Sequence, residues 1–261
     1  MNLLISAAVA LGMALVAVCA TFAVALARRR YDTIDTFWGL GFALIAVVAF
    51  PYGTGDLALR LVVTGLTVVW GVRLAVHLHL RNRGQPEDPR YAGMADRPAS
   101  RVFVRVYLLQ ALVLWFVSLP VLAAQHGTGI GVLGWLGVAV WSIGFAFEVV
   151  GDEQLRRFKA DPANHGRVLD TGLWRYTRHP NYFGDACVWW GLYLLACSTW
   201  PGAATVLSPL VMTFTLVKGT GKPLLEKGLH RTRPGYAYYV ERTSGFFPLP
   251  PRRATPPSAR R

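Results

Sequence analysis

Long apolar runs separated by short polar segments recur along the whole chain. We predict that seven of them cross a membrane, since a spanning helix needs roughly 20 mostly apolar residues. They lie at residues 3–27, 37–52, 57–78, 102–124, 130–150, 183–199 and 203–217. The pattern therefore predicts an all-α, polytopic integral membrane protein. It would be a seven-transmembrane-helix bundle forming one domain over residues 1–250, followed by a disordered basic tail at 251–261.

Composition and charge limit the partners of the protein. The 261 residues include 27 Lys and Arg against 14 Asp and Glu, which gives a net charge of +13. These cations follow the positive-inside bias of membrane loops, since only Arg60 lies beside a predicted outer loop. We therefore predict no nucleic-acid partner and a bacterial inner-membrane protein with its N-terminus outside and its C-terminus in the cytoplasm. Cys19, Cys187 and Cys197 have no metal-ligand spacing, so no metal site is predicted.

The stretch GLWRYTRHPNYFGD, residues 172–185, combines cations and aromatic residues just before a predicted helix. Pro180 suits the first turn of that helix, whose N-terminal N–H groups attract anions. Asn181 and Asp185 are four residues apart and share one helix face. A membrane-interface anchor would account for the Arg and Tyr residues equally well. It would not account for Asp185, because an ionisable group inside a membrane helix is a functional candidate by default.

Four polar stripes with a spacing of four residues fall at helix ends predicted to be cytoplasmic. They are Arg73–His77–Arg81, Glu148–Asp152–Arg156, Asn181–Asp185 and Lys218–Lys222–Glu226. Surface pairing within one helix would also give this spacing. The segment 81–101 between two spans is polar, and we expect a partner or ligand to order it.

If the stripes share one cytoplasm-facing cavity, its chemistry suits a cofactor that carries phosphate. Cations hold phosphates, carboxylates accept from ribose hydroxyls, and aromatic rings stack on the cofactor rings. No GxGxxG or Walker motif is present, so a Rossmann or P-loop fold is not predicted. The residues predicted to bind the cofactor are Asp152, Arg156, Arg175, Tyr176, Arg178, His179, Asn181, Asp185, Lys218, Lys222 and Glu226.

GLWRYTRHPNYFGD, with EDPRY upstream and KPLLEKGLHRTRPGYAYYVERTSGFFPLP downstream, resembles the bacterial DUF1295 family. That family is similar to the C-terminal domain of steroid 5-alpha-reductases. The resemblance implies a seven-helix enzyme that uses NADPH to reduce an activated carbon–carbon double bond. By position, Asp152, Asn181 and Asp185 match cofactor residues of that family, and Asp185 stands where the steroid enzymes carry Glu. The family also has a cationic and aromatic stripe at the positions of Lys218, Lys222 and Glu226, but its residue types differ from those of this chain.

The N-terminal half departs from the steroid enzymes. His77 and Arg81 match a His-x-x-x-Arg pair, but Leu78 replaces the Tyr that follows the His. A Gln-Glu pair is missing, and the nearest acids are Asp32 and Asp35. We therefore predict that the catalytic acid is His77, Asp32 or Asp35, and that the substrate is steroid-like or lipid-like.

The RHPNY stretch also resembles isoprenylcysteine and phospholipid methyltransferases, which bind S-adenosylmethionine. Their pattern places two adjacent Glu residues in the tail, where this chain has Glu226 and Lys227. An NADPH-dependent membrane reductase is therefore the expected function, with an S-adenosylmethionine-dependent methyltransferase as the alternative. A non-enzymatic protein that binds membrane lipids is a third hypothesis, and it predicts that the polar stripes point apart.

Overall fold

The computed structural model describes residues 3–91, 93–219 and 222–253. Within these ranges the regular structure is helical, apart from one isolated bridge between Thr177 and Ser244. Six described helical runs are long and apolar enough to cross a membrane. The prediction of an all-α, polytopic membrane protein is therefore confirmed. Most of the tail predicted to be disordered, residues 254–261, lies outside the described residues.

The helices follow the predicted apolar runs closely. The first three runs form α1 (Leu3–Arg28), α2 (Thr33–Ala49) with the 3-10 turn η1 (Phe50–Tyr52), and α3 (Leu57–Asn82). The fourth run is a continuous stretch of four elements, which are α4 (Ala99–Val102), the π-helix η2 (Phe103–Leu108), α5 (Leu109–Val117) and α6 (Leu119–Ala124). The later runs form α7 (Val132–Ala160), α8 (Pro180–Ala196), α9 (Trp200–Ala203), η5 (Ala204–Val206) and α10 (Leu207–Val217). The polar segments contribute η3 (Pro162–Asn164), η4 (Gly172–Arg175), α11 (Lys222–Thr232) and α12 (Tyr236–Arg242).

Two helices extend beyond the predicted spans by a turn or more. α2 begins at Thr33, before the span predicted from residue 37, and α7 continues to Ala160, beyond the span predicted to end at residue 150. The six candidate spans do not include α8, whose 17 residues lie at the lower limit for crossing a bilayer. The predicted span at residues 183–199, and with it the count of seven spans, therefore stays a prediction.

The chain divides into two compact units. Unit 1 comprises Met1–Trp135 and Leu192–Ser208, and unit 2 comprises Leu136–Gly191 and Pro209–Arg261. The single transmembrane domain predicted over residues 1–250 stays a prediction. The candidate catalytic acids His77, Asp32 and Asp35 belong to unit 1, whereas all of the predicted cofactor residues belong to unit 2.

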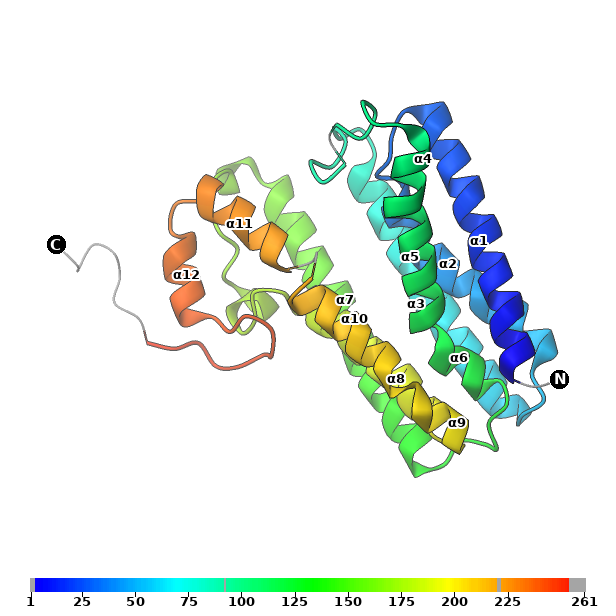
Figure 1. Ribbon diagram of the computed structural model, residues 1–261. Helices are drawn as coiled ribbons and strands as arrows, with labels where there is room; N and C mark the ends of the chain where they lie inside the picture. The colour runs from blue at the N-terminus through cyan, green and yellow to red at the C-terminus, as the bar shows by residue number, and fades with distance from the viewer. Residues whose placement is uncertain (1–2, 92, 220–221, 254–261) are drawn as a thin grey trace. The chain divides into compact units, whose positions relative to one another are not determined.

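Unit 1 is an up-and-down bundle in which α1, α2, α3 and the α4–α6 stretch lie side by side (Figure 1). α2 and α3 pack closest, because Gly39 and Gly71 let the two backbones touch. A Cβ atom at either glycine would overlap the carbonyl oxygen of the other. Trp70 and Phe42 fill the interior beside this contact, with ring centroids 5.7 Å apart.

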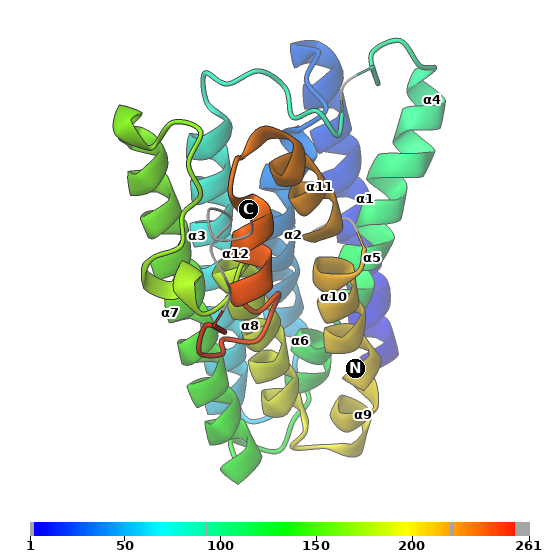
Figure 2. The same ribbon diagram turned by 90° about the vertical axis from the view of Figure 1, so that its left-hand side faces the viewer.

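Unit 2 contains most of α7 and α8, which also pack through glycine. A Cβ atom at Gly144 would lie 2.5 Å from the carbonyl oxygen of Gly184, and one at Gly191 would lie 2.6 Å from that of Gly137. Such small-residue contacts are typical of helix pairs in membranes. α11 and α12 follow α10 as a short helical pair, which Figure 2 shows with the rest of the unit.

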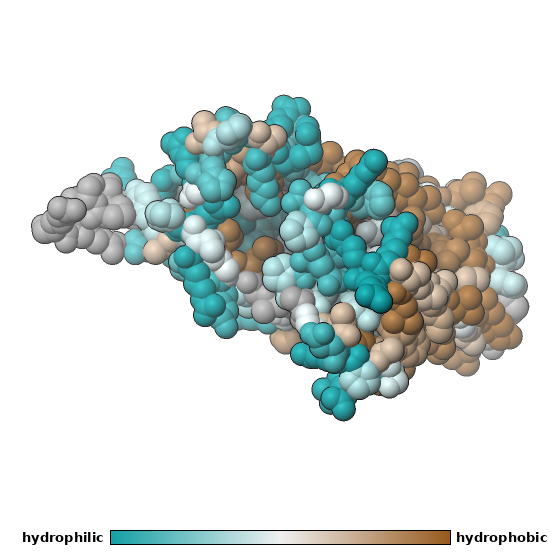
Figure 3. All heavy atoms as spheres, turned by 90° about the horizontal axis from the view of Figure 1, so that it is seen from above, coloured by the Kyte–Doolittle hydropathy of each residue, from teal (hydrophilic) through white to brown (hydrophobic). Residues whose placement is uncertain are grey.

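The outward faces of the long helices are apolar. In the most apolar 18-residue stretch of α1, only 22% is buried inside the protein, and in that of α3 only 28% is. Figure 3 shows hydrophilic side chains gathered apart from a wide hydrophobic surface. Apolar surface of this extent suits contact with lipid rather than with water.

Candidate functional site

Arg178 ties the segment before α8 to the end of the chain. Its Nη1 donates to the carbonyl oxygens of Val240 and Thr243 at 3.0 and 2.8 Å, and its Nε donates to Glu226 at 2.9 Å. Its backbone N–H donates to the oxygen of Ser244 at 2.9 Å. The residue is only 9% exposed. Arg178, which the sequence predicted as a cofactor ligand, therefore holds three parts of unit 2 together. They are the segment before α8, the helix α11, and the end of α12 with the residues that follow it.

The neighbouring residues are fixed by the same C-terminal segment. The Thr177 hydroxyl donates to the oxygen of Phe246 at 2.8 Å, and the N–H of Leu249 donates to the oxygen of Tyr176 at 3.0 Å. On the other side, the indole of Trp174 donates to the oxygen of Gly151 in α7 at 3.0 Å. Segment 174–179 is consequently held between α7 and the chain end.

Glu226, on α11, accepts hydrogen bonds from two members of that segment. Besides Arg178, His179 Nε2 lies 2.9 Å from Glu226 Oε1, and the His179 ring stacks on Tyr182 with an interplanar angle of 6°. Burial would raise the pKa of Glu226, but the hydrogen bonds from His179 and Arg178 outweigh it and hold the pKa at about 2. Burial lowers the pKa of His179 below its ordinary value, although Glu226 opposes this. A neutral His179 that donates to an ionised Glu226 fits both shifts.

Lys222 lies one turn before Glu226 and completes what we call the Arg178 cluster: Arg178, His179, Lys222 and Glu226. A Cβ atom at Gly245 would overlap the Lys222 ammonium and would lie 3.1 Å from Arg178 Nη2. The absence of a side chain at Gly245 thus leaves room for both cations. The charges of Arg178 and Glu226 cancel and His179 is neutral, so Lys222 gives the cluster a net positive charge.

A second polar contact lies at the start of α8. Asn181 Nδ2 donates to Asp152 Oδ1 on α7 at 3.1 Å, and Asp152 is buried. Pro180 packs against Gly151, where a Cβ atom would lie 3.0 Å from the proline ring. Asp185 lies one turn after Asn181 and is half-buried. Asn181 and Asp152, predicted from different stripes, are therefore direct partners.

The remaining predicted cofactor residues face outward. Arg156, Arg175, Tyr176 and Lys218 are exposed. The guanidinium of Arg156 pairs with Glu153 of the same helix at 2.6 Å, as expected for surface pairing within a helix. The structure thus brings together Asp152 with Asn181, and Arg178 with His179, Lys222 and Glu226.

In unit 1, the candidate acids anchor the polar segment between α3 and α4. Asp35 is 8% exposed and accepts from Arg90 at 2.5 Å and from the Tyr91 hydroxyl at 2.6 Å. The N–H of Tyr31 donates to Glu87 in the same segment. We expected a partner or ligand to order this segment, whereas the corner between α1 and α2 holds it.

The other two candidate acids have different surroundings. Asp32 is buried and pairs with Arg30 at 2.6 Å, and His77 is half-buried on α3. Sequence reasoning missed Arg90 and Tyr91 as partners of Asp35. Both lie in the EDPRY motif, which was the available signal.

Comparison with known proteins places the chain among sequences of undefined activity. A family model described as "Protein of unknown function (DUF1295)" matches residues 21–243. A protein of Schizosaccharomyces pombe described as uncharacterized is 22% identical over 260 residues, covering 84% of this chain and 73% of the relative. Comparison with solved structures gives no significant match.

Glu226→Gln tests the importance of the Arg178 cluster, because it keeps the side-chain shape but removes the charge opposite Arg178. Removing one partner of a buried ion pair costs about 3–5 kcal/mol, and the slight exposure of Glu226 places the expected loss at about 3 kcal/mol. The pKa of Glu226 is lowered to about 2 in the folded protein. Its contribution should therefore be complete above about pH 5 and decline as the pH falls towards 2. Thermal unfolding in detergent should show a smaller difference from wild type at about pH 3.5 than at about pH 7.

Glu153→Gln is the matched control, since its partners Arg156 and Arg157 are 64% and 75% exposed. Exposed ion pairs contribute about 0–1 kcal/mol, so this variant should unfold close to wild type. Equal losses in the two variants, or a Glu226→Gln loss that does not change with pH, would contradict this view of the cluster.

Proposed function

The chain belongs to the DUF1295 family, and we propose that it is a membrane-embedded reductase that uses NADPH. Its reaction would be the reduction of an activated carbon–carbon double bond in a steroid-like or lipid-like substrate, as the resemblance to steroid 5-alpha-reductases implies. The observation that supports this most is the Arg178 cluster. It leaves a net positive charge beside the N-terminus of α8, at a segment fixed before any ligand arrives.

The residues of unit 2 have the chemistry that NADPH requires. Arg175, Lys218 and Lys222 form no ion pair with any described residue, so their charges can serve the cofactor phosphates. The Asn181–Asp152 pair and Asp185 offer amide and carboxylate groups to ribose hydroxyls or to the carboxamide. The exposed ring of Tyr176 offers a stacking face.

Arg178, His179 and Glu226 have a different role in this proposal. Their hydrogen bonds are made to one another and to backbone carbonyls, so they shape the site and hold its segments in place. When bound, NADPH supplies the hydride. His77, Asp32 and Asp35 stay candidates for the group that polarises the substrate carbonyl or delivers a proton.

A thermal-shift series tests the cofactor. We expect NADPH to stabilise the detergent-solubilised protein more than NADH does, because only NADPH carries the 2′-phosphate. Lys222→Gln removes a charge-assisted contact of about 1.5–3 kcal/mol, which corresponds to roughly 10- to 150-fold weaker binding. Asp185→Ala should also reduce the shift. Arg157→Gln is the matched control, because it removes a cation of the same unit that already pairs with Glu153.

Three outcomes would contradict the proposal. Equal shifts with NADPH and NADH would remove the role of the 2′-phosphate. A shift with S-adenosylmethionine alone would favour the methyltransferase. The lack of any shift with these three compounds would favour a non-enzymatic protein that binds lipids.

We also propose that the protein lies in the bacterial inner membrane, with its N-terminus outside and its C-terminus in the cytoplasm. Arg28, Arg29 and Arg30 directly follow the first predicted span, and the segment between α3 and α4 carries three more arginines, Arg83, Arg90 and Arg97. A C-terminal fluorescent-protein fusion should then be bright, and a C-terminal alkaline phosphatase fusion should be inactive. The reverse pattern would overturn this orientation.

A further inference from the structure

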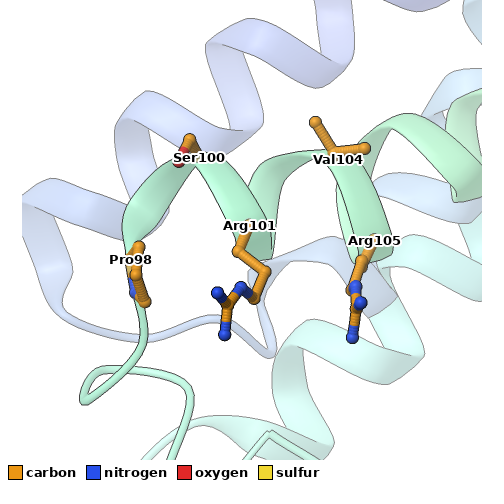
Figure 4. Close-up of a pocket in the computed structure, with 5 residues that line it drawn as sticks. All are labelled: Pro98, Ser100, Arg101, Val104 and Arg105. Atoms are coloured by element: carbon orange, nitrogen blue, oxygen red, sulfur yellow. The ribbon is translucent and has the colours of Figure 1, made fainter.

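The start of the α4–α6 stretch carries two arginines that form no ion pair with any described residue. Arg101 and Arg105 are both exposed, and their side chains project from the same side of the helix, one turn apart (Figure 4). In the same unit, Arg30 and Arg90 pair with aspartates. The charges of Arg101 and Arg105 are therefore available to an anion from outside the protein.

A hollow of about 350 Å³ lies beside these arginines. Pro98, Ser100, Arg101, Val104 and Arg105 line it. The two guanidinium groups can donate hydrogen bonds there. Val104, which projects from the opposite side of the helix in Figure 4, is apolar and 55% exposed. This part of the helix thus carries donors for an oxyanion on one side and apolar surface for hydrocarbon on another.

The backbone at this position is unusual as well. Residues Phe103–Leu108 form a π-helix, which includes both Val104 and Arg105. π-helical turns inside α-helical stretches are rare and frequently occur at functional sites. This wide turn begins within a candidate membrane span, Ala99–Ala124, so the hollow lies at a span end.

We propose that this hollow binds the phosphodiester of an anionic membrane phospholipid. Arg101 and Arg105 hold the phosphate oxygens, because the planar guanidinium matches an oxyanion with two parallel hydrogen bonds. The hollow lies at the end of a candidate membrane span, where the hydrocarbon of a lipid can reach the exposed Val104, which favours a phosphate carried by a lipid over a free phosphate ion. Clusters of Lys and Arg beside the ends of membrane helices attract the head groups of anionic lipids. This site is independent of the proposed reductase activity.

Native mass spectrometry of the full-length protein in detergent tests the site. The probes are dioleoyl-phosphatidylglycerol, which is anionic, and dioleoyl-phosphatidylcholine, which has no net charge. Wild type should prefer the anionic lipid by about 10-fold or more, and Arg101→Gln/Arg105→Gln should lose that preference. Arg156→Gln/Arg157→Gln removes two exposed arginines that already pair with Glu153, and it should keep the preference.

The single variants Arg101→Gln and Arg105→Gln should each show a partial loss, and they carry the test if the double variant fails to fold. Inorganic phosphate should not displace the bound lipid. The proposal is overturned if the double variant keeps its preference, or if the control loses as much. Displacement of the lipid by inorganic phosphate at equal concentration would assign the site to free phosphate instead.

Discussion

A buried arginine carries a charge and five N–H donors that must find partners, and Arg178 sets this requirement for unit 2. It meets the requirement with the carboxylate of Glu226 and the carbonyl oxygens of Val240 and Thr243. These partners come from α11, from α12 and from the residue that follows α12, far along the sequence from α8. The C-terminal segment therefore takes its place because the charge of Arg178 must be matched, and the segment before α8 is fixed by the same contacts.

This arrangement separates two roles among the polar residues of the RHPNY stretch. Arg178 and His179 serve the fold, since their donors point to Glu226 and to the backbone. The charges of Arg178 and Glu226 cancel, so Lys222 contributes the net positive charge of the cluster. Asn181 contributes an amide that is paired with Asp152. The proposed cofactor would then meet a surface whose shape is set by one group of residues and whose affinity comes from another. Such prior ordering reduces the entropy lost on binding.

The apolar runs predicted the helices well because burial in lipid demands them, but polar residues obscured several boundaries. α2 begins at Thr33, since Asp35 can be buried once Arg90 and Tyr91 contact it, and hydropathy does not record such partners. α7 continues to Ala160 as a charged helix, where Glu153 pairs with Arg156 and Arg157. Local spacing identified Arg178 and Glu226 as important. It could not show that they bind each other, because that contact depends on how residues 48 positions apart fold together.

We propose that segment 174–185, together with the start of α11, forms a preorganised surface for NADPH. Hydrogen–deuterium exchange of the full-length protein in detergent, with and without NADPH, tests this most directly. Without the cofactor, the amides of Arg178 and Leu249 should already exchange slowly, because both are hydrogen-bonded to backbone oxygens. NADPH should then slow exchange in residues 180–185 and 222–226, and leave residues 83–91 unchanged. Fast exchange at Arg178 without the cofactor, or protection by NADPH confined to unit 1, would contradict the account.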